Sequence, residues 1–100
     1  MHYLLTYDYT ADYLERRGAY RNAHIAAAWQ AQEKGELVLA GAAGDPLDSA
    51  VFVFDCDSAA PIEAFVKADP YYVNGLVGRY TIKPWTTVVG KDAKTPVRPE

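Results

Sequence analysis

The chain has 100 residues and a mass of 11.0 kDa, which allows one domain with a modest hydrophobic core. Half of its residues are apolar and 23% are charged, which argues against a disordered chain, and its net charge of −3 argues against non-specific nucleic-acid binding. A lone cysteine excludes an internal disulfide and a multi-cysteine zinc site. No apolar run approaches the roughly 20 residues of a membrane helix. The N-terminus lacks the pattern of a signal peptide, so we expect a cytoplasmic protein without membrane contact.

A strand and a broken helical stretch open the chain. Aromatic and aliphatic residues over 2–8 predict the first strand. A polar joint follows over 9–12, and Gly18 interrupts the short helical stretch after it. Residues 19–34 are rich in alanine and predict a long helix, which Gly35 ends as a left-handed cap. The apolar residues of this helix that we expect to face inward are Ile25, Ala28 and Trp29.

Two strands joined by a turn follow the long helix. Residues 37–41 predict a short second strand, and the glycine, aspartate and proline within 42–49 predict a turn. Residues 50–54 form a continuous apolar run, which is typical of a strand that is buried on both faces.

A second helix and a last strand complete the domain. Asp57 or Ser58 is expected to cap the helix, which must end at Asp69-Pro70 because a residue before proline disfavours helical geometry. A tight connection leads to a strand over 77–83, and a further short strand is expected over 85–89. The inward stripe predicted for the helix consists of Ile62, Phe65 and Val66.

The predicted order β-α-β-β-α-β is the ferredoxin-like α+β arrangement, with a four-stranded antiparallel sheet. It occupies residues 1–89, and the polar residues 90–100 are expected to form a flexible tail. Two helices cover only one face of such a sheet, yet the third strand is apolar on both sides, and Tyr3, Leu5 and Tyr7 add apolar surface. We therefore expect a homodimer packed through the open sheet face, or a bound small molecule.

His24 is the candidate for acid–base chemistry, since His2 lies at the terminus. A carboxylate paired with an imidazole fixes its tautomer and stabilises the imidazolium, which makes a proton shuttle near neutral pH. The best carboxylate candidate is Asp69, at the junction between a helix end and a turn. Alternatively, His24 is a partly buried helix residue and Asp69 only caps the turn that Pro70 begins.

Further side chains can assist such a pair. Arg17 and Arg21 lie one helical turn apart and can hold an anionic group, although a solvated surface explains them equally well. Tyr7 and Tyr71 can line a cleft with their phenols or belong to the core. Cys56 lies between two aspartates, which disfavour the thiolate, so it is a poor nucleophile. Two scattered histidines make no metal pattern, and we expect no metal and no cofactor.

Three segments of the chain resemble the YCII (YciI-like) family. Residues 12–24 carry arginines followed by a histidine at the family's spacing. Residues 68–71, Ala-Asp-Pro-Tyr, with the Asn-Gly-Leu of 74–76, resemble its aspartate-proline motif and the glycine after it. Lys83-Pro84-Trp85 is similar to the family's basic-proline-aromatic ending of the last strand. The resemblance covers residues 1–89 and omits the tail.

This resemblance implies a dimeric α+β barrel, similar to muconolactone isomerase, with a candidate active site at His24 and Asp69. One departure is visible: family members often carry Gly-Pro after the second strand, where this chain has Gly41-Ala42. We therefore expect a different pocket rim. The family name supplies no substrate, because most members have no assigned reaction.

We predict a small cofactor-free enzyme of the lyase or isomerase type, which moves a proton next to a carbonyl, a lactone or an activated aromatic ring. His24 is its base or acid, Asp69 orients the imidazole, and Arg17 or Arg21 binds an anionic substrate. A binding or accessory domain without turnover is the main alternative. An RNA-binding module has the same order of elements, and residues 52–54 (Phe-Val-Phe) echo its aromatic motif, but the basic-glycine lead is missing and the net charge has the wrong sign.

Overall fold

Four antiparallel strands form the sheet in the computed structural model, which describes residues 1–100. They pair in the order β2-β3-β1-β4. Aromatic and β-branched residues dominate the two central strands, because such side chains pack well on a pleated surface. The strands are β1 (His2–Tyr9), β2 (Leu37–Gly44), β3 (Leu47–Asp55) and β4 (Val77–Pro84).

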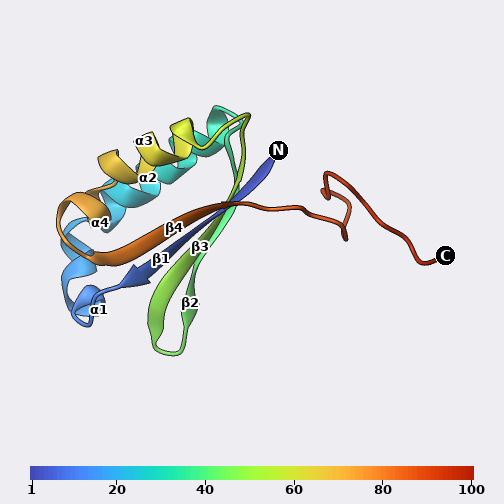
Figure 1. Ribbon diagram of the computed structural model, residues 1–100. Coiled ribbons are helices and arrows are strands. Elements are labelled where there is room, and N and C mark those ends of the chain that lie inside the picture. Colours follow the sequence, from blue (N-terminus) through green and yellow to red (C-terminus); the bar gives the residue numbers. More distant parts are fainter.

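Two long helices, α2 (Arg21–Glu33) and α3 (Ala60–Ala68), lie on one face of this sheet (Figure 1). Two short helices, α1 (Tyr13–Arg16) and α4 (Pro70–Val73), precede α2 and follow α3, and a 3₁₀ turn, η1 (Arg17–Ala19), joins α1 to α2. None of these helices has both the length and the apolar character that a membrane span requires. The predicted ferredoxin-like α+β fold is confirmed.

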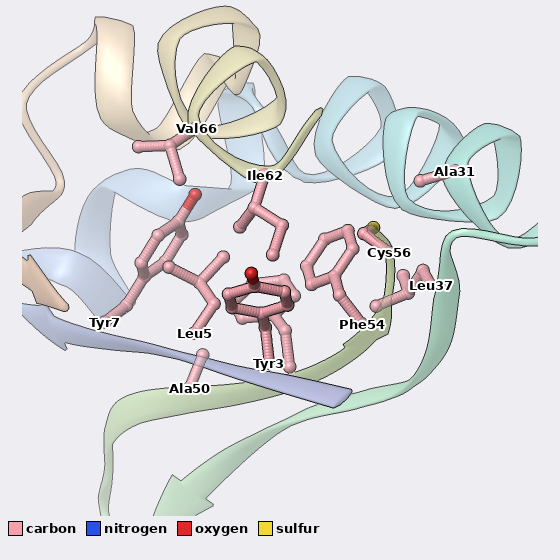
Figure 2. Close-up of a cluster of buried hydrophobic side chains, with 11 residues drawn as sticks. Tyr3, Leu5, Tyr7, Ala31, Leu37, Ala50, Phe54, Cys56, Ile62 and Val66 are labelled. Atoms are coloured by element: carbon pink, nitrogen blue, oxygen red, sulfur yellow. The ribbon is translucent and has the colours of Figure 1, made fainter. Parts of the chain in front are cut away.

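The core lies between the sheet and the two long helices. Side chains of a strand alternate between its two faces, and the pairing of Leu5 with Phe52 places both residues on the helix-covered face. Figure 2 shows side chains rising from β1 toward those that descend from α3. This cluster includes Tyr3, Leu5, Tyr7, Phe54, Ile62 and Val66.

The opposite face of the sheet carries no helix (Figure 1). By register, Leu4, Leu39, Val51 and Val53 share this uncovered face. We expected residues 50–54 to be buried on both faces, but only the three that face the helices are buried, and Val51 is exposed. One chain by itself therefore buries a single face of this strand.

The inward stripe predicted for the long helix is confirmed at Ala28, which packs against the core, and is wrong at Ile25 and Trp29. The buried residues of α2 are His24 and Ala31, whereas Ile25 is exposed and Trp29 is 61% exposed. Ile25 and Trp29 line a cavity between α2 and β2, so these two side chains face open space instead of packed side chains. The stripe of the second helix agrees better, because Ile62 and Val66 are buried in α3.

Two connections differ from those expected. β2 runs to Gly44 instead of ending at residue 41, because its small residues pair with β3 almost to the turn. The segment after the second long helix contains α4, with Asp69 as its N-cap and Pro70 as its first residue. The cap expected from Asp57 or Ser58 is wrong, because the N-cap of α3 is Ala59; the Ser58 Oγ accepts a hydrogen bond from the Ala60 N–H at 3.3 Å.

After β4 the chain extends away from the domain (Figure 1). The fifth strand expected over 85–89 does not form, although the Trp85 N–H still donates to the carbonyl of His2 at 2.9 Å. The tail contacts the domain at Lys94, whose Nζ lies 2.6 Å from Oδ2 of Asp55. Lys94, together with the N-terminal ammonium, lowers the pKa of Asp55 to about 2.

Candidate active site

Asp69 lies at the centre of a buried hydrogen-bond network. Pro70 favours an extended backbone at Asp69, which ends α3 there and lets the side chain cap α4 by accepting from the Tyr71 N–H at 3.0 Å. The same Oδ1 lies 2.7 Å from Nδ1 of His24, and the Tyr7 hydroxyl donates to Oδ2 at 2.7 Å. Asp69 is 0% exposed. Each oxygen of this carboxyl thus has at least one hydrogen-bond partner, and such an arrangement suits an ionised carboxylate, which only accepts.

His24 presents its second ring nitrogen to the cavity. Because an ionised carboxylate only accepts, Nδ1 carries the proton that it shares with Asp69, and the lone pair of the neutral ring is on Nε2. Nε2 has no hydrogen bond within the chain. Because every fully buried side-chain nitrogen or oxygen has a hydrogen-bond partner, Nε2 is not fully buried, and it is open to the cavity that His24 lines. The ring of Tyr71 stacks on the imidazole at 3.9 Å and 11°, which fixes its tilt.

The cavity has a volume of about 500 Å³, within the range of about 300–1,000 Å³ that is usual for small-molecule sites. It lies between α2 on one side and β2 with part of β3 on the other. Tyr9, Tyr13 and Phe52 line its inner end near His24, and the largely exposed Trp29 lines its outer end. Gly41 and Ala42 also line it, so the position where the chain departs from the family's Gly-Pro pattern belongs to the pocket.

Arg17 and Arg21 line the cavity, and neither forms an ion pair within the chain. The Arg17 guanidinium lies 5.5 Å from the centroid of the Tyr13 ring, and its Nη1 is 3.4 Å from the Tyr13 hydroxyl. This hydrogen bond raises the pKa of Arg17, which therefore stays cationic. Two unpaired guanidinium groups favour an anionic ligand in this cavity.

The phenols of the site keep their protons at neutral pH. Burial and the neighbouring charge of Asp69 raise the pKa of Tyr7 well above its usual value of 10.0. Burial also raises the pKa of Tyr9, and it raises that of Tyr71 to about 12. His24 is therefore the cavity side chain with a ring nitrogen free to accept a proton.

Most of the predicted site residues come together. His24 and Asp69 meet, and Arg17, Arg21 and Tyr71 line the same cavity. Tyr7, expected to line the cleft, instead lies fully buried behind the cavity wall, in contact with Asp69.

Sequence reasoning missed Tyr9 and Tyr13. Tyr9 is the last residue of β1 and continues the alternation of Tyr3, Leu5 and Tyr7 on the helix-covered face, which was the available signal for it. Tyr13 lies four residues before Arg17, and this helical spacing was the signal for Tyr13. Phe52 and Phe54 are buried beneath the helices, so they offer no platform on the open face for RNA bases.

The chain belongs to the YCII-related domain family, whose model matches residues 1–86. This agrees with the resemblance seen in the sequence and extends over nearly all of the folded domain. Comparison with curated proteins gives no match.

Two solved structures are similar in fold. One is 5-chloro-2-hydroxyhydroquinone dehydrochlorinase (TftG) from Burkholderia phenoliruptrix AC1100, in complex with 2,5-dihydroxybenzoquinone; the TM-score is 0.75 at 20% identity, over 94% of this chain and 100% of that one. The other is a protein of Agrobacterium tumefaciens, with a TM-score of 0.58 at 19% identity, over 94% of this chain and 98% of that one. At such identities these matches establish the fold.

Proposed function

We propose that this protein is a small cofactor-free enzyme of the lyase or isomerase type that uses His24 and Asp69 for proton transfer on a small organic molecule. One observation carries the proposal: Asp69 holds Nδ1 of His24 at 2.7 Å, which leaves Nε2 open to a cavity of about 500 Å³. The fold neighbour TftG, a dehydrochlorinase crystallised with a small ring compound, supports the lyase class.

The geometry suits proton abstraction from carbon. Nε2 of His24 takes a proton from a carbon next to a carbonyl, a lactone or an activated ring, and the electron pair of the broken C–H bond moves onto oxygen to give an enolate. Asp69 stabilises the resulting imidazolium through the Nδ1–H. Return of the proton to another carbon completes an isomerisation, and departure of a group from the adjacent carbon completes an elimination.

Arg17 and Arg21 are proposed to bind the anionic part of the substrate, because both guanidinium groups line the cavity without an internal ion-pair partner. Tyr71 is proposed to contact the substrate with its ring edge and to hold the imidazole by stacking. Tyr7 supports the site through Asp69.

Exchange of substrate hydrogen with solvent deuterium tests the proposal without knowledge of the natural substrate. The protein is incubated in D₂O with lactones, keto acids and 2,5-dihydroxybenzoquinone, and loss of C–H signals is followed by ¹H NMR. His24→Gln should lower the exchange rate by roughly 10²–10⁴-fold, the usual contribution of a general base. His2→Gln is the matched control and should leave the rate unchanged, since His2 lies outside the cavity.

Compounds that bind in the cavity without any exchange above the buffer rate would contradict catalysis. The protein would then be a non-catalytic small-molecule-binding domain, which remains the second candidate.

The lone Cys56 is buried and unpaired, which is compatible with the proposed location in the cytoplasm.

A homodimer packed through the uncovered sheet face is also proposed. Leu4, Val51 and Val53 form an apolar strip there, and such strips are usually covered by a partner. Sedimentation equilibrium at micromolar concentration should give twice the chain mass, and Val51→Asp should give the mass of one chain. Val73→Asp, at an exposed valine of α4, is the control and should stay dimeric. A monomeric wild-type protein would contradict the proposal.

A further inference from the structure

The inner wall of the cavity is made of ring faces and edges. Tyr9 and Tyr13 stack with centroids 3.6 Å apart and planes 3° from parallel. Tyr71 meets both of them edge-on, at 5.9 Å and 5.6 Å, and stacks in turn on His24. All four side chains line the cavity. A flat ring is the ligand shape that such a wall contacts best, through stacked or edge-to-face pairs.

The floor of the cavity carries small side chains. Ala40 and Ala42 of β2 lie opposite Phe52 and Ala50 of β3 in the register, on the face that α2 covers. An alanine projects a single methyl group, so these residues fill little of the space between β2 and α2. The floor therefore leaves room for a flat ring beneath α2.

The charge in the cavity has one sign. Arg17 and Arg21 line it, and no aspartate or glutamate does, because Asp69 lies behind His24 with no exposed surface. Arg17 sits over the ring of Tyr13, so one cation adjoins the aromatic wall. A ligand that satisfies both features must carry its negative charge on or next to a flat ring.

We propose that the cavity takes a planar, unsaturated ring bearing an ionised oxygen group, with the ring against Tyr9 and Tyr13 and the charged oxygen at Arg17 and Arg21. This inference rests on the proposed function in one respect, that the cavity is the substrate site. It narrows the substrate from small carbonyl, lactone or aromatic compounds to flat ring anions such as ring carboxylates and phenolates. Lactones without a charge and open-chain acids fall outside it.

Three matched probes separate shape from charge. Benzoate is flat and charged, cyclohexanecarboxylate is charged but puckered, and benzyl alcohol is flat but neutral. Binding is measured by the fluorescence of Trp29 in a Trp85→Phe background, since the chain has two tryptophans and only Trp29 lines the cavity. Benzoate should bind about tenfold more tightly than either of the other two.

Variants assign the preference to residues. Arg17→Gln with Arg21→Gln should lower benzoate affinity at least tenfold and leave benzyl alcohol affinity unchanged. Arg16→Gln is the matched control, because Arg16 lies one residue away, donates to the carbonyl of Asn74 and does not line the cavity. Tyr9→Leu should bring the affinities for benzoate and cyclohexanecarboxylate together.

Equal affinity for the flat and puckered acids, no response to the double arginine change, or no binding of benzoate at millimolar concentration would each overturn the inference. The outcome is separable from that of the proposed function. Deuterium exchange on a non-planar substrate would keep the catalytic proposal and remove this one. Selective benzoate binding without exchange on any ring anion would keep this one and remove catalysis.

Discussion

The two ends of the cavity are built in opposite ways. At the inner end, Asp69 has no exposed surface, each of its oxygens has a donor, and the rings of Tyr71 and His24 are stacked. At the outer end, Trp29 is 61% exposed, although its side chain is apolar and lines the same space.

This contrast separates the end of the cavity that contacts within one chain hold in place from the end that these contacts leave exposed. The inner end is closed by contacts among β1, α2 and α4 of a single chain, so its geometry is as stable as the fold. The outer end gains little from folding, because its apolar surface stays in water. Substitutions at the inner end should therefore change stability, and those at the outer end should change binding or association.

The largest effect is expected from Asp69→Ala. The change leaves the Tyr7 hydroxyl, the His24 ring N–H and the Tyr71 N–H without an acceptor in a buried place, and each such group costs about 1–3 kcal/mol. After partial relaxation we expect the free energy of unfolding to fall by roughly 3–5 kcal/mol, measured by urea denaturation. Asp92→Ala, in the exposed tail, is the control and should change it by less than about 0.5 kcal/mol. A loss below about 1 kcal/mol for Asp69→Ala would mean that the inner network does not hold the fold.

A much smaller effect on stability is expected from Trp29→Ala. The side chain is mostly exposed, and alanine is the better helix former, so the free energy of unfolding should change by less than about 1 kcal/mol. The affinity for benzoate, measured by calorimetry because this variant lacks the reporter tryptophan, should fall in the same variant, since Trp29 lines the cavity. A stability loss that grows with protein concentration would show instead that a second chain covers Trp29.

The smallest effect is expected from the tail. Deletion of residues 92–100 should lower the free energy of unfolding by less than about 1 kcal/mol, since its contacts with the domain are exposed. A loss of several kcal/mol in a urea titration would mean that the tail packs on the domain or on a partner chain.

The tail also predicts a pH dependence. Lys94 and the N-terminal ammonium lower the pKa of Asp55 from 3.8 to about 2. The ion pair therefore stabilises the fold fully when the pH is above the pKa of Asp55 in the unfolded chain, and this stabilisation is lost as the pH falls from about 4 to 2. Lys94→Ala should cost less than about 1 kcal/mol at neutral pH, because the pair is partly exposed, and nothing below pH 2. A cost that persists at the acid end would show that Lys94 acts through another contact.

The sequence was sufficient for features that local rules govern. Pro70 ends the helix before it, which places Asp69 at the junction and frees its side chain for capping. Gly35 has a positive φ of 80° at the end of α2, as its cap position predicts. The order of elements then followed, and with it the ferredoxin-like fold.

Features that depend on distant contacts could not be predicted in the same way. Ile25 and Trp29 have the spacing of a buried stripe, but only the width of the cavity decides whether anything packs on them. Tyr7 lies 62 residues from Asp69 in the chain, and its hydroxyl reaches that carboxyl because β1 passes beneath α4. The alternation of aromatic residues along β1 predicts that the Tyr7 ring faces the core, but it does not predict that the Tyr7 hydroxyl donates to Asp69.

The central claim is that Nε2 of His24 is an unprotonated nitrogen open to the cavity. Diethyl pyrocarbonate acylates neutral imidazole nitrogens, and peptide mass spectrometry assigns the modified histidine. In the folded protein near neutral pH we predict acylation of His24 at Nε2, slowed by benzoate in the cavity. A His24 that resists the reagent in the folded protein, yet reacts once the chain is unfolded, would contradict the account.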